Sequence, residues 1–318
     1  MKLFSQFDRS NILPPVMVAV AAMLWGTDAV WRTDLLKTLT SPAIVFWEHV
    51  ILVTLTGWLI WRGRRSLKAF NRGDWISLAV VGVGASALAT VLFTEAFKQT
   101  NPTTVILLQK TQPLVAIAAA AVVLKEPLPA RFWPMLPVCL FGAYLISFGS
   151  MKPITSLGSI GDAPAGAAMA LGAAFLWGMG TVLGRRLLGK VSFLTLTALR
   201  FTVALPALAV SLAVIGWATP SSAALPSLFF LAVVAGLFGL MLYYRGLRGT
   251  PAAIATLCEL SFPVMAIIIN SIVLDAGISP RQIVGVALLW GGIALMRHRL
   301  LRPAAPRKAN TPSPDPAG

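Results

Sequence analysis

Long apolar runs recur along the chain from Pro14 to Met296, with only short polar breaks between them. A helix needs about 20 mainly apolar residues to cross the hydrocarbon core of a bilayer, and the runs are close to that length. The composition agrees, because 57% of the 318 residues are hydrophobic and 12% are charged, whereas about 25% are charged in typical soluble domains. The sequence therefore predicts an all-α integral membrane protein that crosses the bilayer several times.

Proline, glycine and charged residues divide the apolar runs into ten expected transmembrane helices. The first run carries Asp28 and lacks a convincing cleavage site, so we expect it to be retained rather than removed as a signal peptide. The proline-rich, basic residues 298–318 are expected to form a disordered cytoplasmic tail. The approximate limits of the ten helices are 14–31, 42–61, 74–96, 102–124, 131–149, 163–184, 192–217, 226–247, 251–274 and 279–297.

Basic residues are distributed unequally between the two sides of the predicted bundle. Of the 26 Lys and Arg, nineteen lie in the termini and the loops of one side, five lie in loops of the other, and Lys110 and Arg200 lie inside spans. Because cytoplasmic loops carry an excess of Lys and Arg, we expect a multi-pass protein of the inner (plasma) membrane with both termini cytoplasmic. Membrane topology also accounts for the net charge of +15, so no nucleic-acid partner is predicted.

The two halves of the chain resemble each other. Trp25-Gly26 corresponds to Trp177-Gly178 at an offset of 152 residues, and Pro113 corresponds to Pro263 at an offset of 150. Each half holds five spans, and because five is odd, equivalent helices must cross the membrane in opposite directions. This inverted repeat is the plan of many secondary transporters, with the binding site near the midplane between the halves. The predicted units are 14–149 and 163–297.

The ordered set of these motifs resembles a known family. It comprises the Leu-Trp-Gly starts at 24–26 and 176–178, Arg200 in the segment TALRF, and the segments Pro-Leu-Val at 113–115 and Pro-Val-Met at 263–265. Over about residues 14–297 the chain resembles the EamA-type branch of the drug/metabolite transporter superfamily, in particular its exporters of amino acids and other metabolites. The resemblance implies ten helices in two inverted repeats around a central cavity, and transport of small metabolites.

Several charged or ionisable side chains interrupt the apolar runs. A charge at the centre of a membrane helix costs about 2.5–3.5 kcal/mol on insertion scales, so such residues are expected to face the bundle interior and find partners there. They fit two roles, the gates of a transport path or static bridges between helices, and the sequence leaves both open. These residues are Glu48, His49, Glu95, Arg200 and Arg245.

Glu48 stands where the first repeat of the family often carries an arginine. Its expected partners are His49, Lys98, Lys110 or a backbone donor, all on the same half of the membrane. The span that carries Glu48 is expected to lie outside the central cavity, so the carboxylate is assigned a supporting role there.

Two prolines point to the substrate site. Proline has no N–H, so Pro113 leaves the carbonyl of Gln109 free and Pro263 leaves that of Glu259 free. Broken helices are tolerated in membranes where they line a cavity, so we expect the site at these breaks. The ammonium of Lys110 and the carboxylate of Glu259 together suit a zwitterion such as an amino acid. The alternative is a pair of proline kinks with a structural Lys–Glu bridge.

Aromatic residues are candidate walls of the same cavity, because each combines an apolar face with a polar tip. The candidates are Trp25, Trp177, Tyr243 and Tyr244. The two tryptophans are favoured, because they lie well inside their spans rather than at the ends, where tryptophan usually anchors a helix.

The sequence gives little support to other classes of function. It has no nucleotide-binding loop and no catalytic motif of the kinds G-x-S-x-G or H-E-x-x-H. It has two Cys and two His, so no metal and no cofactor is predicted. We therefore expect a secondary transporter, not an enzyme, that works by alternating access and favours an amino acid or related zwitterion as substrate, in the export direction. The alternatives are a transporter of amines, drugs or carboxylates, a channel, and a membrane-embedded enzyme. The sequence is compatible both with coupling to a proton and with facilitated diffusion.

Overall fold

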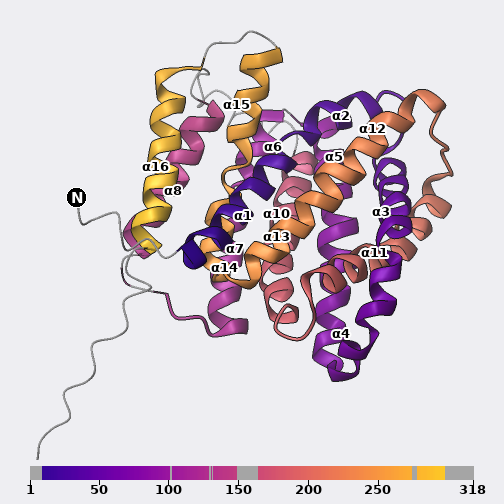
Figure 1. Cartoon of the computed structure of the whole chain (residues 1–318). Helices are drawn as coiled ribbons and strands as arrows, with labels where there is room; N and C mark the ends of the chain where they lie inside the picture. The colour runs from indigo at the N-terminus through magenta and orange to yellow at the C-terminus, as the bar shows by residue number, and fades with distance from the viewer. Residues whose placement is uncertain are drawn as a thin grey trace, which may run out of the picture.

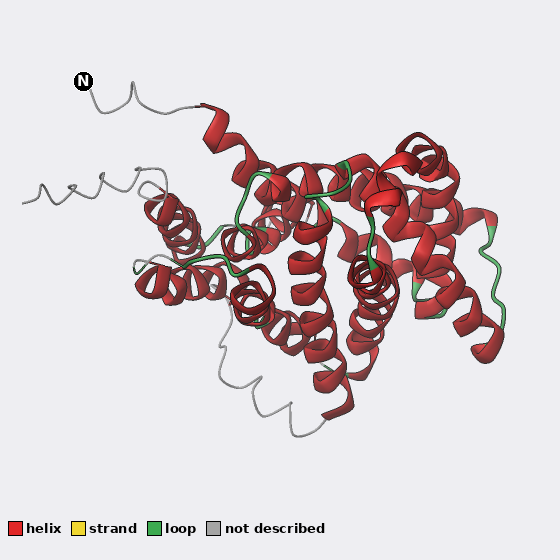
Figure 2. Cartoon of the chain, turned by 90° about the horizontal axis from the view of Figure 1, so that it is seen from below, coloured by secondary structure: helices red, strands yellow, loops and turns green. Residues whose placement is uncertain are grey.

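The computed structural model describes residues 9–100, 102–128, 130, 132–148, 164–273 and 278–297, and within these ranges the chain is helical with no β-strand (Figures 1 and 2). Seven helical stretches are long and apolar enough to cross a membrane, and three further apolar helices are shorter: Ile12–Trp25, Phe132–Ser147 and Pro280–Met296. The chain is therefore a multi-pass membrane protein. The predicted tail, 298–318, lies outside the described residues.

Five of the ten predicted spans consist of more than one helical element. In the first half these are α1 (Arg9–Trp25), α2 (Asp28–Leu35), α3 (Ser41–Gly63), η1 (Arg64–Ala69), α4 (Arg72–Ala79), η2 (Val80–Leu88), α5 (Ala89–Gln99), α6 (Pro102–Gln109), α7 (Gln112–Ala119), η3 (Ala120–Leu124) and α8 (Phe132–Phe148). In the second half they are α10 (Pro164–Leu187), α11 (Phe193–Ile215), η5 (Ser222–Ala224), α12 (Leu225–Phe230), η6 (Leu231–Phe238), α13 (Gly239–Arg248), α14 (Ala252–Glu259), α15 (Phe262–Val273) and α16 (Pro280–Arg297).

Two helix breaks occur at corresponding places in the halves. Helix α6 ends at Gln109 and α7 begins at Gln112, and likewise α14 ends at Glu259 and α15 begins at Phe262. Each break is a short turn closed by bonds between residues three apart, and the second residue of the helix that follows is a proline, which cannot donate a backbone hydrogen bond. The breaks leave polar side chains and backbone carbonyls in the middle of the bundle.

Two glycines let neighbouring helices reach these breaks. A Cβ atom on Gly26, at the end of α1, would lie 2.5 Å from the carbonyl oxygen of Phe262. A Cβ atom on Gly178, in α10, would lie 2.9 Å from Cβ of Val115 and 3.1 Å from the carbonyl oxygen of Gln112. Only glycine permits an approach this close without a shift of the backbone, so each break is packed against a glycine from another span.

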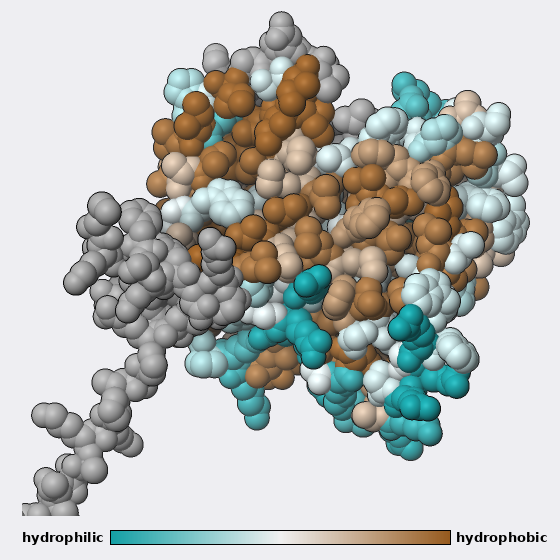
Figure 3. Space-filling view, in the orientation of Figure 1, coloured by the Kyte–Doolittle hydropathy of each residue, from teal (hydrophilic) through white to brown (hydrophobic). Residues whose placement is uncertain are grey.

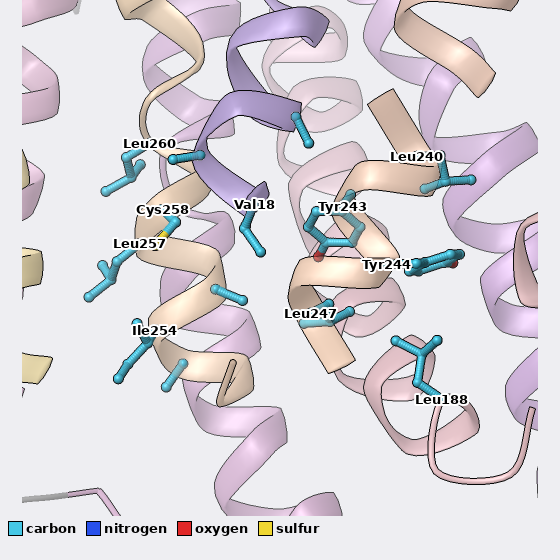
Figure 4. Close-up of a cluster of buried hydrophobic side chains, with 14 of the residues drawn as sticks. Val18, Leu188, Leu240, Tyr243, Tyr244, Leu247, Ile254, Leu257, Cys258 and Leu260 are labelled. Atoms are coloured by element: carbon cyan, nitrogen blue, oxygen red, sulfur yellow. The ribbon is translucent and has the colours of Figure 1, made fainter. Parts of the chain in front are cut away.

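The helices group around one interior. Helix α1 packs on α13 and α14, where Val18, Tyr243, Tyr244 and Leu257 belong to the main cluster of buried side chains (Figure 4). Helices α8 and α16 pack together at one edge of the molecule, and α3 packs on α11 at the other (Figure 1). On the face seen in Figure 3, apolar residues form a broad band across the middle, and hydrophilic residues gather at the end of the molecule near α4. This surface suits a protein whose middle lies in hydrocarbon.

Candidate functional site

A central cavity lies between the two helix breaks. It is lined from α1, α5, α10 and α13 as well as from the breaks, and also from α2, α3, η2, η6 and α11. Of the predicted cavity residues, Trp25, Gln109, Trp177, Tyr243 and Glu259 line it, whereas Lys110 and Tyr244 do not. The cavity therefore brings both halves of the chain to one site.

Glu259 is the centre of the polar wall. Its carboxylate accepts hydrogen bonds from Gln112 Nε2 at 2.5 Å, from the hydroxyl of Tyr243 at 2.7 Å and from Thr181 Oγ1 at 3.2 Å. Gln109 Nε2 donates in turn to Gln112 Oε1 at 2.9 Å. All of these donors are neutral, and no Lys, Arg or His of the described chain lies within 4.0 Å of this carboxylate. Glu259 is thus a carboxylate held in the bundle by neutral groups, at the C-terminal end of α14, where the helix dipole disfavours negative charge.

Lys110 occupies different surroundings from Glu259. Its ammonium lies 5.2 Å from the ring centroid of Phe262, the residue that begins α15, and within the described residues it forms no ion pair with Glu259. The turn between α6 and α7 therefore directs Gln109 and Gln112 into the cavity and Lys110 against an aromatic face.

Aromatic side chains form the rest of the wall. The ring centroids of Trp25 and Tyr243 lie 5.0 Å apart, and those of Trp177 and Phe93 also lie 5.0 Å apart. Phe262 lines the cavity as well. The two predicted tryptophans are thus each paired with a second ring at the cavity surface.

An ion pair and a bonded histidine form a further part of the lining. Arg32 Nη2 lies 3.4 Å from Glu48 Oε2, and both side chains are less than a tenth exposed. The ring nitrogens of His49 contact the Val45 carbonyl oxygen at 2.8 Å and Ser86 Oγ at 3.0 Å. Helix α3 therefore delivers a pair of adjacent polar residues to the cavity.

One expectation about Glu48 was wrong, since the span that carries it lines the cavity rather than lying outside it. Glu48 also forms an ion pair with Arg32, a cation that was not among its expected partners. The predicted limits end the first span at residue 31 and so place Arg32 in the loop that follows. The chain turns at Gly26 and Thr27 and continues as α2, which packs on α12 and η6 and returns Arg32 to the interior.

Arg200 also lines the cavity and is held by neutral groups. Its Nη1 donates to the hydroxyl of Tyr244 at 3.1 Å and its Nη2 to the carbonyl oxygen of Ala85 at 3.0 Å. Trp25 Nε1 makes a matching bond to the carbonyl oxygen of Ala235 at 3.0 Å. The two acceptors lie in η2 and η6, which are π-helical stretches at corresponding places in the halves. Such stretches often occur at functional sites.

The other predicted gate charges lie away from the cavity lining. Glu95 in α5 accepts a hydrogen bond from Ser41 Oγ at 2.8 Å and pairs with Lys98 at 3.5 Å. Arg245 is exposed, with its guanidinium 6.0 Å from the ring centroid of Phe193.

Thr181 is a lining residue that sequence reasoning did not find. It follows Trp177 by four residues in α10, and residues four apart share one face of a helix. The helical position of a predicted cavity tryptophan was therefore the signal that could have identified it. Over the described residues no group of three or more potential metal ligands occurs.

The chain can now be compared with known proteins. The family model of EamA-like transporters matches residues 13–148 and 164–297. The chain is 31% identical over 299 residues to a riboflavin transporter, ImpX, of Fusobacterium nucleatum subsp. nucleatum, covering 88% of this chain and 96% of that protein. It is 23% identical over 236 residues to an uncharacterized transporter of Archaeoglobus fulgidus, covering 73% of this chain and 79% of that protein.

A solved crystal structure shares the fold with a TM-score of 0.71 at 18% identity, over 91% of this chain and 99% of that one. These comparisons confirm the resemblance inferred from the Leu-Trp-Gly starts and the paired prolines. They identify a transporter of small metabolites rather than an enzyme. The chain belongs to the EamA-like transporter family.

Proposed function

We propose that the chain is a secondary transporter of a small planar heteroaromatic metabolite of the riboflavin type, which binds in the central cavity. The observation that carries the proposal is the aromatic lining of that cavity. Flat rings stack favourably on aromatic side chains, and Trp25, Trp177 and Phe262 come from three different spans. The likeness to a riboflavin transporter over most of both chains supports the same substrate class.

The polar wall complements such a substrate. Gln109, Gln112 and Thr181 offer both donors and acceptors, while Glu259 offers acceptors alone. A flavin-like ring carries carbonyl groups and an imide N–H at one edge, and its side chain carries hydroxyls. A few placed polar groups in an aromatic pocket are typical of ligand sites that fix orientation.

An amino acid or related zwitterion is the second candidate, and Arg200 favours it. The sequence assigned the substrate carboxylate to Lys110, which does not line the cavity. Arg200 and Glu259 both line it. The carboxylate of a zwitterion would therefore pair with Arg200, and its ammonium group with Glu259.

For the mechanism we propose alternating access between two inverted five-helix repeats, 14–149 and 163–297. Three paired features support it: the two helix breaks, the glycine packed against each break, and the π-helical stretches η2 and η6. The family model also matches the chain twice. Rocking of one repeat against the other around a fixed central site would expose that site to each side in turn.

The carboxylate best placed to carry a coupling proton is Glu259, because it lines the cavity and no Lys, Arg or His of the described residues forms an ion pair with it. Facilitated diffusion differs in a measurable way, since its rate does not depend on a proton gradient. We place the protein in the inner membrane with both termini cytoplasmic, on the excess of Lys and Arg in the loops of that side.

The test is uptake into proteoliposomes that hold the purified protein. Labelled riboflavin is expected to enter saturably and to be accelerated by unlabelled riboflavin trapped inside, with competition from flavin analogues and none from amino acids. Trp25→Ala and Trp177→Ala should weaken the apparent affinity, whereas Trp133→Ala, at a position 57% exposed on α8, should not. Saturable uptake of a labelled amino acid without riboflavin competition would establish the second candidate instead.

A further inference from the structure

A groove lies apart from the central cavity, where the end of α3 and the turn η1 meet the start of α11. Its walls carry two arginines and three hydroxyl groups. The lining residues that matter here are Trp58, Arg62, Arg65, Ser66, Ser192 and Thr195.

The floor of the groove is built by close packing. A Cβ atom on Gly63 would lie 2.2 Å from Thr195 Oγ1, so the last residue of α3 touches the first turn of α11. Ser192 caps α11 by accepting a hydrogen bond from the Thr195 N–H at 3.1 Å, and Ser66 Oγ donates to the Gly63 carbonyl oxygen at 2.7 Å. The N-terminus of the long helix α11 therefore lies at this groove, and helix N-termini attract anions.

The two arginines have no carboxylate partner within the described residues. The salt bridges there include neither Arg62 nor Arg65. Asp74 is the one acidic residue between 49 and 94, and it already contacts Lys190 at 2.5 Å and Arg186 at 3.6 Å. Among the described residues, the positive charge of the groove is therefore not compensated by an ion pair.

An apolar track leads along α3 to the groove. Leu55 and Trp58 are 40% and 56% exposed and lie about one turn apart, with Arg62 a further turn on. The guanidinium of Arg62 lies 5.5 Å from the ring centroid of Trp58. Tryptophan beside arginine at the end of a span marks the boundary between hydrocarbon and headgroups. Figure 3 shows the apolar band giving way to hydrophilic residues at the end of the molecule near α4.

We propose that this groove binds the headgroup of an anionic phospholipid. The phosphate lies between Arg62 and Arg65 at the start of α11, and an acyl chain follows Leu55 and Trp58. The apolar track favours a lipid over a soluble phosphate, which would leave that track without a role. A bound lipid would join α3 to α11, the helices that carry Glu48 and Arg200 into the cavity.

The experiment exposes the purified full-length protein to equal amounts of phosphatidylglycerol and phosphatidylcholine in mixed micelles and measures the retained lipids by native mass spectrometry. Phosphatidylglycerol should be retained in preference. Arg62→Gln combined with Arg65→Gln should lower that preference by about 30-fold, the effect of two cations near an anionic surface. Lys68→Gln combined with Arg72→Gln removes the same charge from the same end of the molecule outside the groove, and should leave the preference intact.

Three results would overturn the proposal. Equal retention of both lipids by the unaltered protein would show no selectivity. An equal loss of preference in the two double variants would show a diffuse surface charge instead of a site. Thermal stabilisation by glycerol 3-phosphate as large as that by phosphatidylglycerol would show a site for small soluble anions. If the Arg62 and Arg65 double variant does not fold, Arg65→Gln alone serves in its place.

Discussion

Arg32 and Glu48 form an ion pair 3.4 Å long inside the membrane-spanning bundle, and both side chains are less than a tenth exposed. The pair joins α2 to α3 at the wall of the central cavity. Next to it, His49 uses both ring nitrogens in contacts with Val45 and Ser86. Polar groups bound to one another in this way favour a supporting role for this part of the wall.

Removal of one charge of this pair should therefore affect stability first. Glu48→Gln removes the negative charge that faces the buried cation of Arg32, and breaking a buried pair typically costs about 3–5 kcal/mol. We expect a lower unfolding temperature with a smaller change in apparent substrate affinity, and partial recovery of stability in the Arg32→Gln, Glu48→Gln double variant. Both are measured by thermal unfolding and by uptake. A large loss of affinity at unchanged stability would place Glu48 in the binding site instead.

Close packing at the helix breaks gives a second prediction. Gly26→Ala places a Cβ atom 2.5 Å from the Phe262 carbonyl oxygen, and overpacking of this kind costs about 1–3 kcal/mol. Gly57→Ala is the matched control, since a Cβ atom there meets nothing within 4 Å. Thermal unfolding should show destabilisation only for Gly26→Ala, and equal behaviour of the two variants would mean that the contact with the break is not tight.

The sequence was informative about the helices because lipid imposes a strong constraint on them. An apolar run must satisfy its own backbone hydrogen bonds, so length and composition alone indicate a membrane helix. The pairing of Arg32 with Glu48 was beyond this reasoning. It depends on how α2 turns after Gly26, and a cation that follows an apolar run is normally an interfacial residue.

Lys110 separates the cavity site from the zwitterion site inferred from the sequence. Because its ammonium lies against Phe262 and not in the cavity lining, Lys110→Met should leave riboflavin uptake close to that of the unaltered protein. The zwitterion site inferred from the sequence requires the opposite, a severe loss of transport in a folded protein. Initial uptake rates at several substrate concentrations distinguish the two, with folding checked by gel filtration.

Orientation follows from the distribution of basic residues. A reporter fused after Pro303 should be active only in the cytoplasm, and one inserted between Lys152 and Asp162 should report the opposite side. Reversed signals would overturn the assignment of both termini to the cytoplasm and the leaflet to which the lipid groove belongs.

The site itself was only partly predictable. Prolines and tryptophans indicated where the cavity lies, and Trp25, Trp177 and Glu259 do line it. The sequence could not predict that Gln109 lines the cavity and Lys110 does not, because the direction of each side chain depends on the turn between α6 and α7. A one-residue difference in a turn decides which of two neighbours faces the cavity.

The central claim is that a planar flavin-like ring stacks on the cavity tryptophans beside Glu259, and titration of the purified protein with riboflavin tests it most directly. Stacking on tryptophan quenches flavin fluorescence, so we predict saturable quenching that is abolished in the Trp25→Leu, Trp177→Leu double variant and retained in Trp133→Leu. Glu259→Gln should weaken binding by about 10- to 100-fold, the usual worth of a hydrogen bond to a charged group. Absence of saturable quenching, or quenching that is unchanged when both cavity tryptophans are replaced, would contradict the account.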